Sequence, residues 1–163
     1  MKKTNAARIL DRAKIEYEII DYDVDPIELG AERVAEKTGQ HIQHIYKTLV
    51  LSGDKTGVIV ACIPGSSELD LKSIAQISKN KKCAMVPMKN IQEITGYIRG
   101  GCSPLGMKKD FPLFMDESAY SMEYILISAG LRGKQIKINP KDLKSVTNAV
   151  VSLISNPKSE TTC

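Results

Sequence analysis

The chain has 163 residues, 42% of them apolar and 26% charged, with four cysteines, no tryptophan and a formal net charge of +4. This composition is typical of one globular domain, and it excludes collagen, intrinsic disorder and small disulfide-bonded scaffolds. At this length a chain buries roughly two thirds of the surface that it exposes when unfolded, so the core needs neither a metal nor a disulfide.

The first quarter of the chain predicts two helices around one strand. Apolar residues recur at helical spacing after Thr4, a suitable N-cap, which predicts a helix over residues 4–14. A short strand is expected at residues 17–22. A second helix is expected at residues 31–38, because Gly39 suits the left-handed position that follows a helix.

The middle of the chain predicts a β-hairpin followed by a helix and a strand. Two apolar runs rich in β-branched residues, at 45–51 and 58–63, are joined by a polar, glycine-containing segment that is typical of a hairpin turn. Asp70 can cap a helix that ends near Ser78, and residues 83–86 form the next predicted strand.

The remaining segments predict two helices, a loop and three strands. Pro87 opens a helix that ends at Gly96, and residues 100–106, dense in glycine and proline, must form a loop. The last expected elements are strands at 111–115, 124–128 and 135–138 and a helix from Pro140 to about Val150.

This order of elements predicts the fold class. Helices alternate with strands, yet hairpins join several strand pairs, so we expect a single α/β (α+β) domain with a mixed, barrel-like sheet surrounded by helices. The domain is expected to span residues 1–155, and the polar residues 156–163 to form a flexible tail.

Neither a membrane span nor a secretion signal is expected. The longest charge-free stretches, 56–67 and 145–157, are shorter than the ~18 apolar residues that a membrane span requires. Charges at Arg8, Asp11 and Arg12 interrupt a signal-like start. The four scattered cysteines form no C-x-x-C pair, which favours reduced thiols. We therefore expect a cytoplasmic protein without a metal site.

The excess positive charge is concentrated in residues 72–109, which carry eight Lys or Arg against Glu93 alone, a net +7. Such a block can lower the free energy of a nearby polyanion, because each neutralised phosphate releases counterions. A solvated surface explains the lysine-rich run 79–82 more simply when that run is taken alone. Composition therefore gives only a weak indication of nucleic-acid binding.

Lys47 is the first residue that could carry chemistry. Strand alternation places it on an apolar face with Ile45, Leu49 and Leu51. A cation on such a face is costly unless it reaches solvent or a partner. Lys47 is therefore either a functional cation or a lysine whose ammonium extends into water, and the pattern leaves both open.

Two glycine-rich loops, 100–106 and 128–133, form a second feature. Their backbone N–H groups could converge on an anionic oxygen, but each loop also fits a tight turn and neither has the spacing of a known phosphate-binding loop. Cys102 lies in the first loop. A cysteine nucleophile needs a base, however, and both histidines, His41 and His44, lie in one remote stretch.

These segments together carry a resemblance to a known family. They are Thr4-Asn5-Ala6, Tyr46-Lys47-Thr48-Leu49, Glu68-Leu69-Asp70-Leu71-Lys72, Thr95-Gly96-Tyr97, the run from Gly100 to Lys109, Asp116-Glu117-Ser118 and Ser128-Ala129-Gly130-Leu131-Arg132-Gly133. In this order, over about residues 4–150, they resemble the YbaK/EbsC-type Cys-tRNA(Pro) deacylases, free-standing relatives of the editing domain of bacterial prolyl-tRNA synthetases. The resemblance implies a mixed β-barrel core and hydrolysis, in trans, of the ester that joins cysteine to mischarged tRNA(Pro).

The resemblance also implies roles for individual residues. The implied catalytic residues are Lys47, on which activity depends most, and Gly101 and Ser128, which position the aminoacyl group. The implied substrate-binding residues are Tyr22, Thr48, Gly100, Ser103, Gly130 and Arg132. No cofactor is implied, because the cysteinyl sulfur attacks its own carbonyl while the protein supplies geometry and stabilises the oxyanion. Lys47 then acts electrostatically, since an ordinary lysine is protonated near neutral pH.

Partners and alternatives complete the expectations. The basic block would bind the tRNA acceptor stem through Lys81, Lys82, Lys108 and Lys109, and prolyl-tRNA synthetase is an implied protein partner. Gln135 stands where some relatives carry aspartate, so no acidic role is assigned to it. Two alternatives stay open: deacylation of other misacylated tRNAs such as Ala-tRNA, and a non-catalytic module that binds tRNA or a synthetase.

Overall fold

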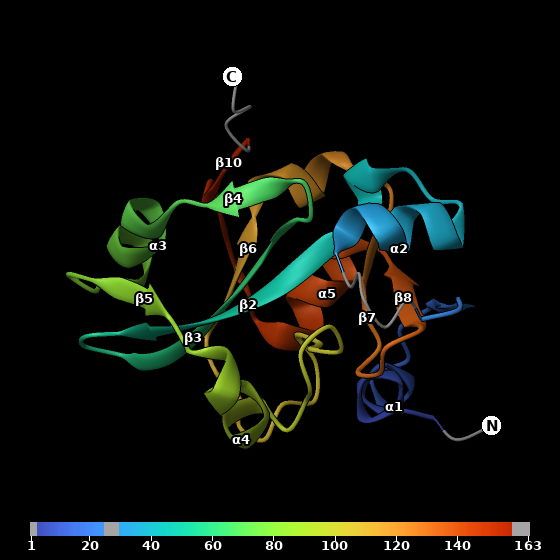
Figure 1. The fold of residues 1–163 in the computed structure, drawn as a ribbon, viewed down its shortest axis with the longest axis horizontal. Helices are drawn as coiled ribbons and strands as arrows, with labels where there is room; N and C mark the ends of the chain where they lie inside the picture. Colours follow the sequence, from blue (N-terminus) through green and yellow to red (C-terminus); the bar gives the residue numbers. More distant parts are fainter. Residues whose placement is uncertain (1–2, 25–29, 158–163) are drawn as a thin grey trace.

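The computed structural model describes residues 3–24 and 30–157, which fold around two central sheets (Figure 1). The larger sheet has the strand order β5-β2-β3-β6-β9 and the smaller has the order β1-β8-β7. The strands of the larger sheet are β2 (Tyr46–Gly53), β3 (Gly57–Pro64), β5 (Cys83–Met85), β6 (Leu113–Asp116) and β9 (Val150–Ser152). The smaller sheet contains β1 (Glu18–Asp21), β7 (Ile125–Ser128) and β8 (Lys134–Ile138).

The mixed strand directions confirm the predicted fold class. β2 and β3 form the expected hairpin, whereas β6 runs parallel to both β3 and β9. One isolated parallel bridge, between Ile45 and Leu126, connects the two sheets. Among the described strands the sheets do not close into a barrel. In place of one barrel-like sheet, the structure has two sheets that meet at this bridge.

The helices begin and end largely where the local signals predict. They are α1 (Asn5–Arg12), α2 (Ala31–Thr38), α3 (Leu71–Ser78), α4 (Ile91–Thr95) and α5 (Pro140–Thr147), with short 3₁₀ helices η1 (Ile42–His44), η2 (Met88–Asn90) and η3 (Glu117–Ser121). The hydroxyl of Thr4 accepts from the amide of Ala7, Asp70 caps α3, and Gly39 ends α2 in the left-handed region. The helix expected after Pro87 is divided into η2 and α4.

Three short strands differ from the sequence-based expectation. The last helix ends at Thr147 rather than near Val150, because Asn148 adopts a left-handed conformation and the next residues pair with β6. β4 (Ser67–Leu69) pairs with β10 (Ser155–Pro157) in a separate ribbon. Residues 156 and 157, expected in the tail, therefore belong to a strand, and residues 158–163 lie outside the described part of the chain.

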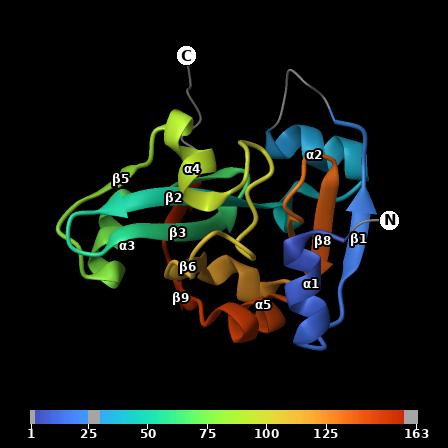
Figure 2. The ribbon, with the colours of Figure 1, turned by 90° about the horizontal axis from the view of Figure 1, so that it is seen from below.

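Helices α1 and α2 pack on opposite faces of the smaller sheet (Figure 2). Leu10 of α1 shares a buried cluster with Ile125 and Ile127 of β7, whereas Val34 of α2 packs with Leu126. Successive side chains of a strand point to opposite faces, so β7 serves both helices. No described helix has the length and hydropathy of a membrane span.

Candidate functional site

A cleft of about 330 Å³ lies where β2 begins, beside the bridge that connects the sheets. It is lined by α2, the first residues of β2, the loop that follows α4, and the facing strands β7 and β8. The lining residues are Ala31, Val34, Ile45, Tyr46, Lys47, Thr48, Leu49, Arg99, Gly100, Cys102, Ser128 and Gln135. Four predicted site residues, Lys47, Thr48, Gly100 and Ser128, therefore meet in one place.

The Lys47 side chain is half-buried at this cleft. Its ammonium donates a hydrogen bond of 3.3 Å to the carbonyl of Gly65, in the turn after β3. The Gly65 amide donates to the Ile45 carbonyl at 2.8 Å, and a Cβ atom at Gly65 would collide with the Cβ of Ala31. The carbonyl of Gly65 thus holds the Lys47 ammonium at the cleft. The sequence analysis missed this role, although the Pro64–Gly65 pair is typical of a turn.

Thr48, the next residue of β2, offers a polar atom without a partner. Its hydroxyl oxygen is buried and has no hydrogen-bond partner in the described part of the protein. An unsatisfied buried polar group costs about 1–3 kcal/mol. Thr48 lines the cleft, but this oxygen has almost no accessible surface, so it marks a local cost in stability and not a contact for a ligand.

A buried hydrogen-bond network anchors β2 at Tyr46. The Tyr46 hydroxyl lies 2.7 Å from the Ser118 hydroxyl, which donates to the Asp116 carboxylate at 2.5 Å. Asp116 also accepts from the amide of Ile154 at 3.0 Å. Burial raises the pKa of Tyr46 to about 12, so the phenol is neutral near physiological pH. The Asp116-Glu117-Ser118 motif therefore supports the strand that carries Lys47.

The opposite wall of the cleft is formed by β7 and β8. Ser128 is buried and stands opposite Gln135 in the strand register. Its hydroxyl accepts a hydrogen bond of 3.1 Å from the Gly130 amide, and the φ of +100° at Gly130 favours glycine there. The buried Gln135 amide donates to the Tyr22 hydroxyl at 3.4 Å, which connects Tyr22 to this wall.

The other residues implied by the resemblance lie beside the cleft or away from it. Gly101 is buried next to the cleft, and its amide donates to the Ile98 carbonyl at 2.9 Å. Arg132 approaches the rim, because its Nε donates to the Arg99 carbonyl at 2.7 Å. Ser103 is fully buried, accepts from the Leu105 amide and does not line the cleft.

Cys102 lines the cleft but is a poor candidate for a nucleophile. Burial raises the pKa of its thiol, and its sulfur lies 3.9 Å from the Thr95 hydroxyl. A thiol with a raised pKa is protonated near neutral pH and therefore reacts slowly. His44, a possible base, is instead stacked on Tyr124 and hydrogen-bonded to its carbonyl. Across residues 3–24 and 30–157 no cluster of His, Cys, Asp and Glu could hold a metal ion.

The four lysines expected to bind phosphate occupy two separate places. The amides of Lys81 and Lys82 bind Asp54 at the tip of the β2–β3 hairpin, at the left of Figure 1. Lys47 and Gly53 are six residues apart in β2, which places this tip about 20 Å from Lys47. Lys108 and Lys109 are exposed in the loop between α4 and β6.

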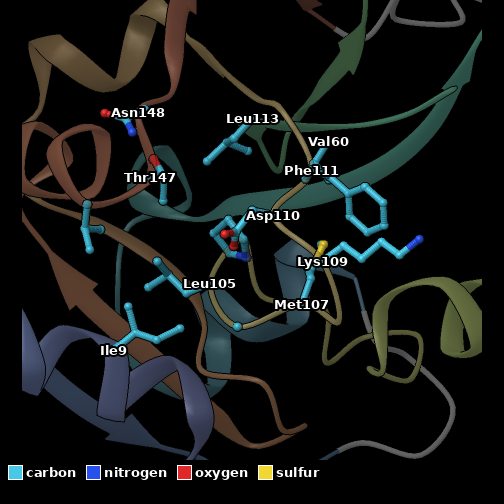
Figure 3. Close-up of a pocket in the computed structure, with 13 residues that line it drawn as sticks. Ile9, Val60, Leu105, Met107, Lys109, Asp110, Phe111, Leu113, Thr147 and Asn148 are labelled. Atoms are coloured by element: carbon cyan, nitrogen blue, oxygen red, sulfur yellow. The ribbon is translucent and has the colours of Figure 1, made fainter. Parts of the chain in front are cut away.

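A second cavity of about 200 Å³ lies between α1, α5 and the loop before β6 (Figure 3). Its walls include the apolar side chains of Ile9, Leu105 and Leu113 and also the polar residues Lys109, Asp110, Thr147 and Asn148. The ammonium of Lys109 extends away from these side chains in Figure 3. None of the predicted catalytic residues lines this cavity.

Comparisons with known proteins identify the family. A profile of the aminoacyl-tRNA editing domain matches residues 28–146. An Enterococcus faecalis protein with the provisional name Cys-tRNA(Pro)/Cys-tRNA(Cys) deacylase EbsC is 48% identical over 147 residues, 90% of each chain.

Solved structures share the fold. A hypothetical protein matches with a TM-score of 0.86 at 20% identity, over 93% of this chain and 99% of its own. A candidate trans-editing enzyme for prolyl-tRNA synthetase matches with a TM-score of 0.81 at 21% identity, over 96% of this chain and 99% of its own. With the profile match and the EbsC identity, the chain belongs to the aminoacyl-tRNA editing domain family.

Proposed function

We propose that the protein is a trans-acting aminoacyl-tRNA hydrolase that cleaves the ester of tRNA(Pro) mischarged with cysteine. The observation that carries this proposal is the convergence of Lys47, its ammonium held by the Gly65 carbonyl, with Gly100 and Ser128 in one cleft. Its volume of about 330 Å³ suits a small polar group such as an aminoacyl ester on a ribose. The extensive identity to EbsC supports the same activity.

The reaction can proceed without a nucleophile from the protein. The cysteinyl sulfur attacks its own carbonyl carbon, the bond from that carbon to the ribose oxygen breaks, and the thiol proton passes to that oxygen, which leaves as the ribose hydroxyl. The small cyclic thioester that results is hydrolysed by water to cysteine. The protein then has to hold sulfur and carbonyl in attack geometry and to stabilise the developing negative charge.

The residues of the cleft suit these tasks. The Lys47 ammonium, held by the Gly65 carbonyl, can pair with ribose or phosphate oxygens of the tRNA end. The raised pKa of Cys102 and the engagement of His44 with Tyr124 favour a mechanism in which the substrate supplies the reactive sulfur.

A deacylation assay over several charged tRNAs tests the proposal. We expect rapid release of cysteine from Cys-tRNA(Pro) and much slower release of alanine or serine, because a methyl or hydroxyl group cannot replace the attacking sulfur. Comparable rates on all three substrates would contradict sulfur-assisted chemistry and favour attack by water. Binding to tRNA without any ester cleavage would identify a non-catalytic module.

Two wider proposals follow from the same activity. Prolyl-tRNA synthetase is the proposed partner, because a small domain that reads mainly the aminoacyl end would gain tRNA selectivity from a synthetase that binds the whole tRNA. The proposed place of action is the cytoplasm, where that substrate forms. Gel filtration of the two proteins with and without tRNA(Pro) tests the complex, and separate elution under both conditions would contradict it.

A further inference from the structure

The strand β5 forms one edge of the larger sheet and lies at one end of the molecule (Figure 1). Among the described strands it pairs only with β2. On that side the amide of Val86 donates to the Val50 carbonyl at 3.0 Å, and the carbonyl of Lys82 accepts from the Asp54 amide at 3.1 Å. The backbone groups of Lys82 and Val86 are therefore directed towards β2.

The backbone groups of Cys83 and Met85 are directed the other way. In an antiparallel pair the direction of hydrogen bonding alternates along the strand, so the N–H and C=O groups of these two residues face away from β2. No described strand pairs with β5 on that side. Such a row of backbone groups is a template on which another extended segment can pair. We call this side of β5 the open edge.

Exposed apolar side chains lie beside the open edge. Met85 is 47% exposed, and Met88 in η2 is 62% exposed. Ile77 of α3 is also exposed, and α3 reaches β5 where the Ser78 hydroxyl lies 3.9 Å from the Cys83 sulfur. Methionine is one of the residues most often buried, and it is enriched where proteins bind varied partners. The open edge therefore offers apolar contacts as well as backbone groups.

The charge around the open edge is entirely positive. Residues 79–89 contain no acidic residue and four lysines, which are Lys79, Lys81, Lys82 and Lys89. All four are exposed, and none forms an ion pair with another described residue. A second copy of the chain would bring the same lysines to the edge, and like charges on neighbouring strands repel. An acidic segment would be attracted instead.

We propose that the open edge binds an extended, acidic segment of a partner protein, which adds to the larger sheet as a further strand beside β5. The backbone of this segment pairs with Cys83 and Met85, its apolar side chains contact Met85 and Met88, and its carboxylates pair with the lysines. An RNA would be attracted by the same charges, but its backbone has no N–H and C=O groups with which to extend a sheet.

This interaction is separate from the proposed ester cleavage. Met85 stands opposite Leu51 in the strand register, four residues along β2 from Lys47. Neither Cys83 nor Met85 lines the cleft that contains Lys47. The open edge is therefore a second functional surface, and its occupant does not have to be a substrate.

Binding of a short synthetic peptide to the full chain tests the proposal. The peptide alternates glutamate with valine, and fluorescence anisotropy should show saturable binding that weakens as the salt concentration rises. The same peptide with its central amide nitrogens methylated keeps every charge but cannot pair as a strand. It should bind about tenfold more weakly, because it has lost backbone hydrogen bonds to the edge.

Substitutions at the methionines test the position of the peptide. Met85→Pro removes an amide N–H that faces away from β2, a position where an edge strand tolerates proline, and should weaken binding about tenfold. Met85→Ser with Met88→Ser keeps this amide but removes apolar contacts, and should also weaken binding about tenfold. The matched control, Leu153→Ser, changes an aliphatic residue that is 60% exposed elsewhere and should keep the wild-type affinity.

The lysines are tested with a matched pair of double substitutions. Lys81→Gln with Lys82→Gln should weaken binding of the peptide and flatten its dependence on salt. Lys141→Gln with Lys144→Gln removes exposed charges of α5 and should change both far less. Circular dichroism should show the same fold in every variant.

The inference is overturned if the methylated peptide binds as tightly as its parent, since the edge would then be a charge site that serves an RNA equally well. It is also overturned if both methionine variants are folded and keep the wild-type affinity. Self-association that gel filtration detects and Met85→Pro abolishes would make a second copy the occupant and overturn it too. None of these results depends on whether the protein cleaves an aminoacyl ester, so the proposed function stands or fails separately.

Discussion

The loop between α4 and β6 lines a different space on each of its two sides. On one side Arg99, Gly100 and Cys102 line the cleft that contains Lys47. On the other side Leu105 and its neighbours line the smaller cavity of Figure 3. Of the two, only the cleft brings a cation held by a backbone carbonyl together with Gly100 and Ser128. The contrast teaches that the groups which a space brings together, rather than the presence of a space, distinguish the candidate site.

Substitution of Lys47 is the strongest test of this contrast. Lys47→Ala should lower kcat/KM for Cys-tRNA(Pro) by at least about a hundredfold, because it removes a positioned charge next to the reacting group. Lys55→Ala changes an exposed lysine of the hairpin turn and should leave the rate unchanged. Circular dichroism checks that both variants are folded. Retained turnover in Lys47→Ala would remove the central residue of the proposed site.

The cavity side of the loop should affect stability instead of chemistry. Leu105→Ala truncates a buried side chain and should lower the free energy of unfolding by about 3 kcal/mol, because the truncation enlarges an existing cavity. Thermal unfolding measures this loss. At a temperature where the variant is folded, its deacylation rate should match that of the wild type. A large loss of rate in the folded variant would mean that the two sides of the loop are coupled.

The basic residues extend the comparison to the tRNA stem. Neutral substitution of Lys81, Lys82, Lys108 and Lys109 together should raise KM. It should also flatten the plot of log KM against log salt concentration, by about one unit of slope for each phosphate that is no longer neutralised. Kinetics at several salt concentrations measure both effects. Unchanged kinetics at every concentration would place the acceptor stem elsewhere.

Tyr46 tests the support beneath the cleft. Tyr46→Phe removes the hydrogen bond to Ser118 and should lower the free energy of unfolding by about 1 kcal/mol at neutral pH. The wild-type protein should also lose stability as pH rises from about 10 towards 12, because the unfolded tyrosine gives up its proton while the folded one, with its pKa raised to about 12, keeps it.

Denaturant unfolding across this pH range measures how steeply the free energy of unfolding falls with pH. This fall should be shallower in Tyr46→Phe. A decline should persist in that variant, because burial also raises the pKa of Cys62 to about 12. Identical slopes in the two proteins would show that Tyr46 titrates normally.

The smallest effect is expected at Cys102. Cys102→Ala should change the rate of deacylation by less than about threefold, because the substrate and not the protein supplies the sulfur, and burial raises the pKa of this thiol. A matched change, Cys83→Ala, alters a cysteine outside the cleft. Loss of activity in Cys102→Ala but not in Cys83→Ala would show that the protein, and not the substrate, supplies the reacting sulfur.

Local signals in the sequence predicted most of the fold. The cap at Asp70, the left-handed Gly39 and the alternating runs of the hairpin each depend on neighbouring residues, and each is confirmed. The three-residue strands β4, β9 and β10 were missed, because their stability comes from distant partners rather than from their own pattern.

The candidate site was predictable in part, for a similar reason. Alternation pointed to Lys47, and the resemblance pointed to Thr48 and Ser128. The Gly65 carbonyl that holds Lys47 and the Asp116 network beneath it join segments far apart in the chain, so only the folded structure reveals them. The buried position of Ser103 was likewise invisible in a loop rich in glycine and proline.

The pairing of β1 with β8 has a consequence for synthesis. Among the described residues, β8 is the only strand that pairs with β1, and more than a hundred residues separate them. A nascent chain leaves the ribosome from its N-terminal end, so β1 must wait with open hydrogen-bonding groups until β8 emerges. Residues of β7 and β8 also complete the cleft. The ribosome must therefore make most of this protein before the chain can assemble its working cleft.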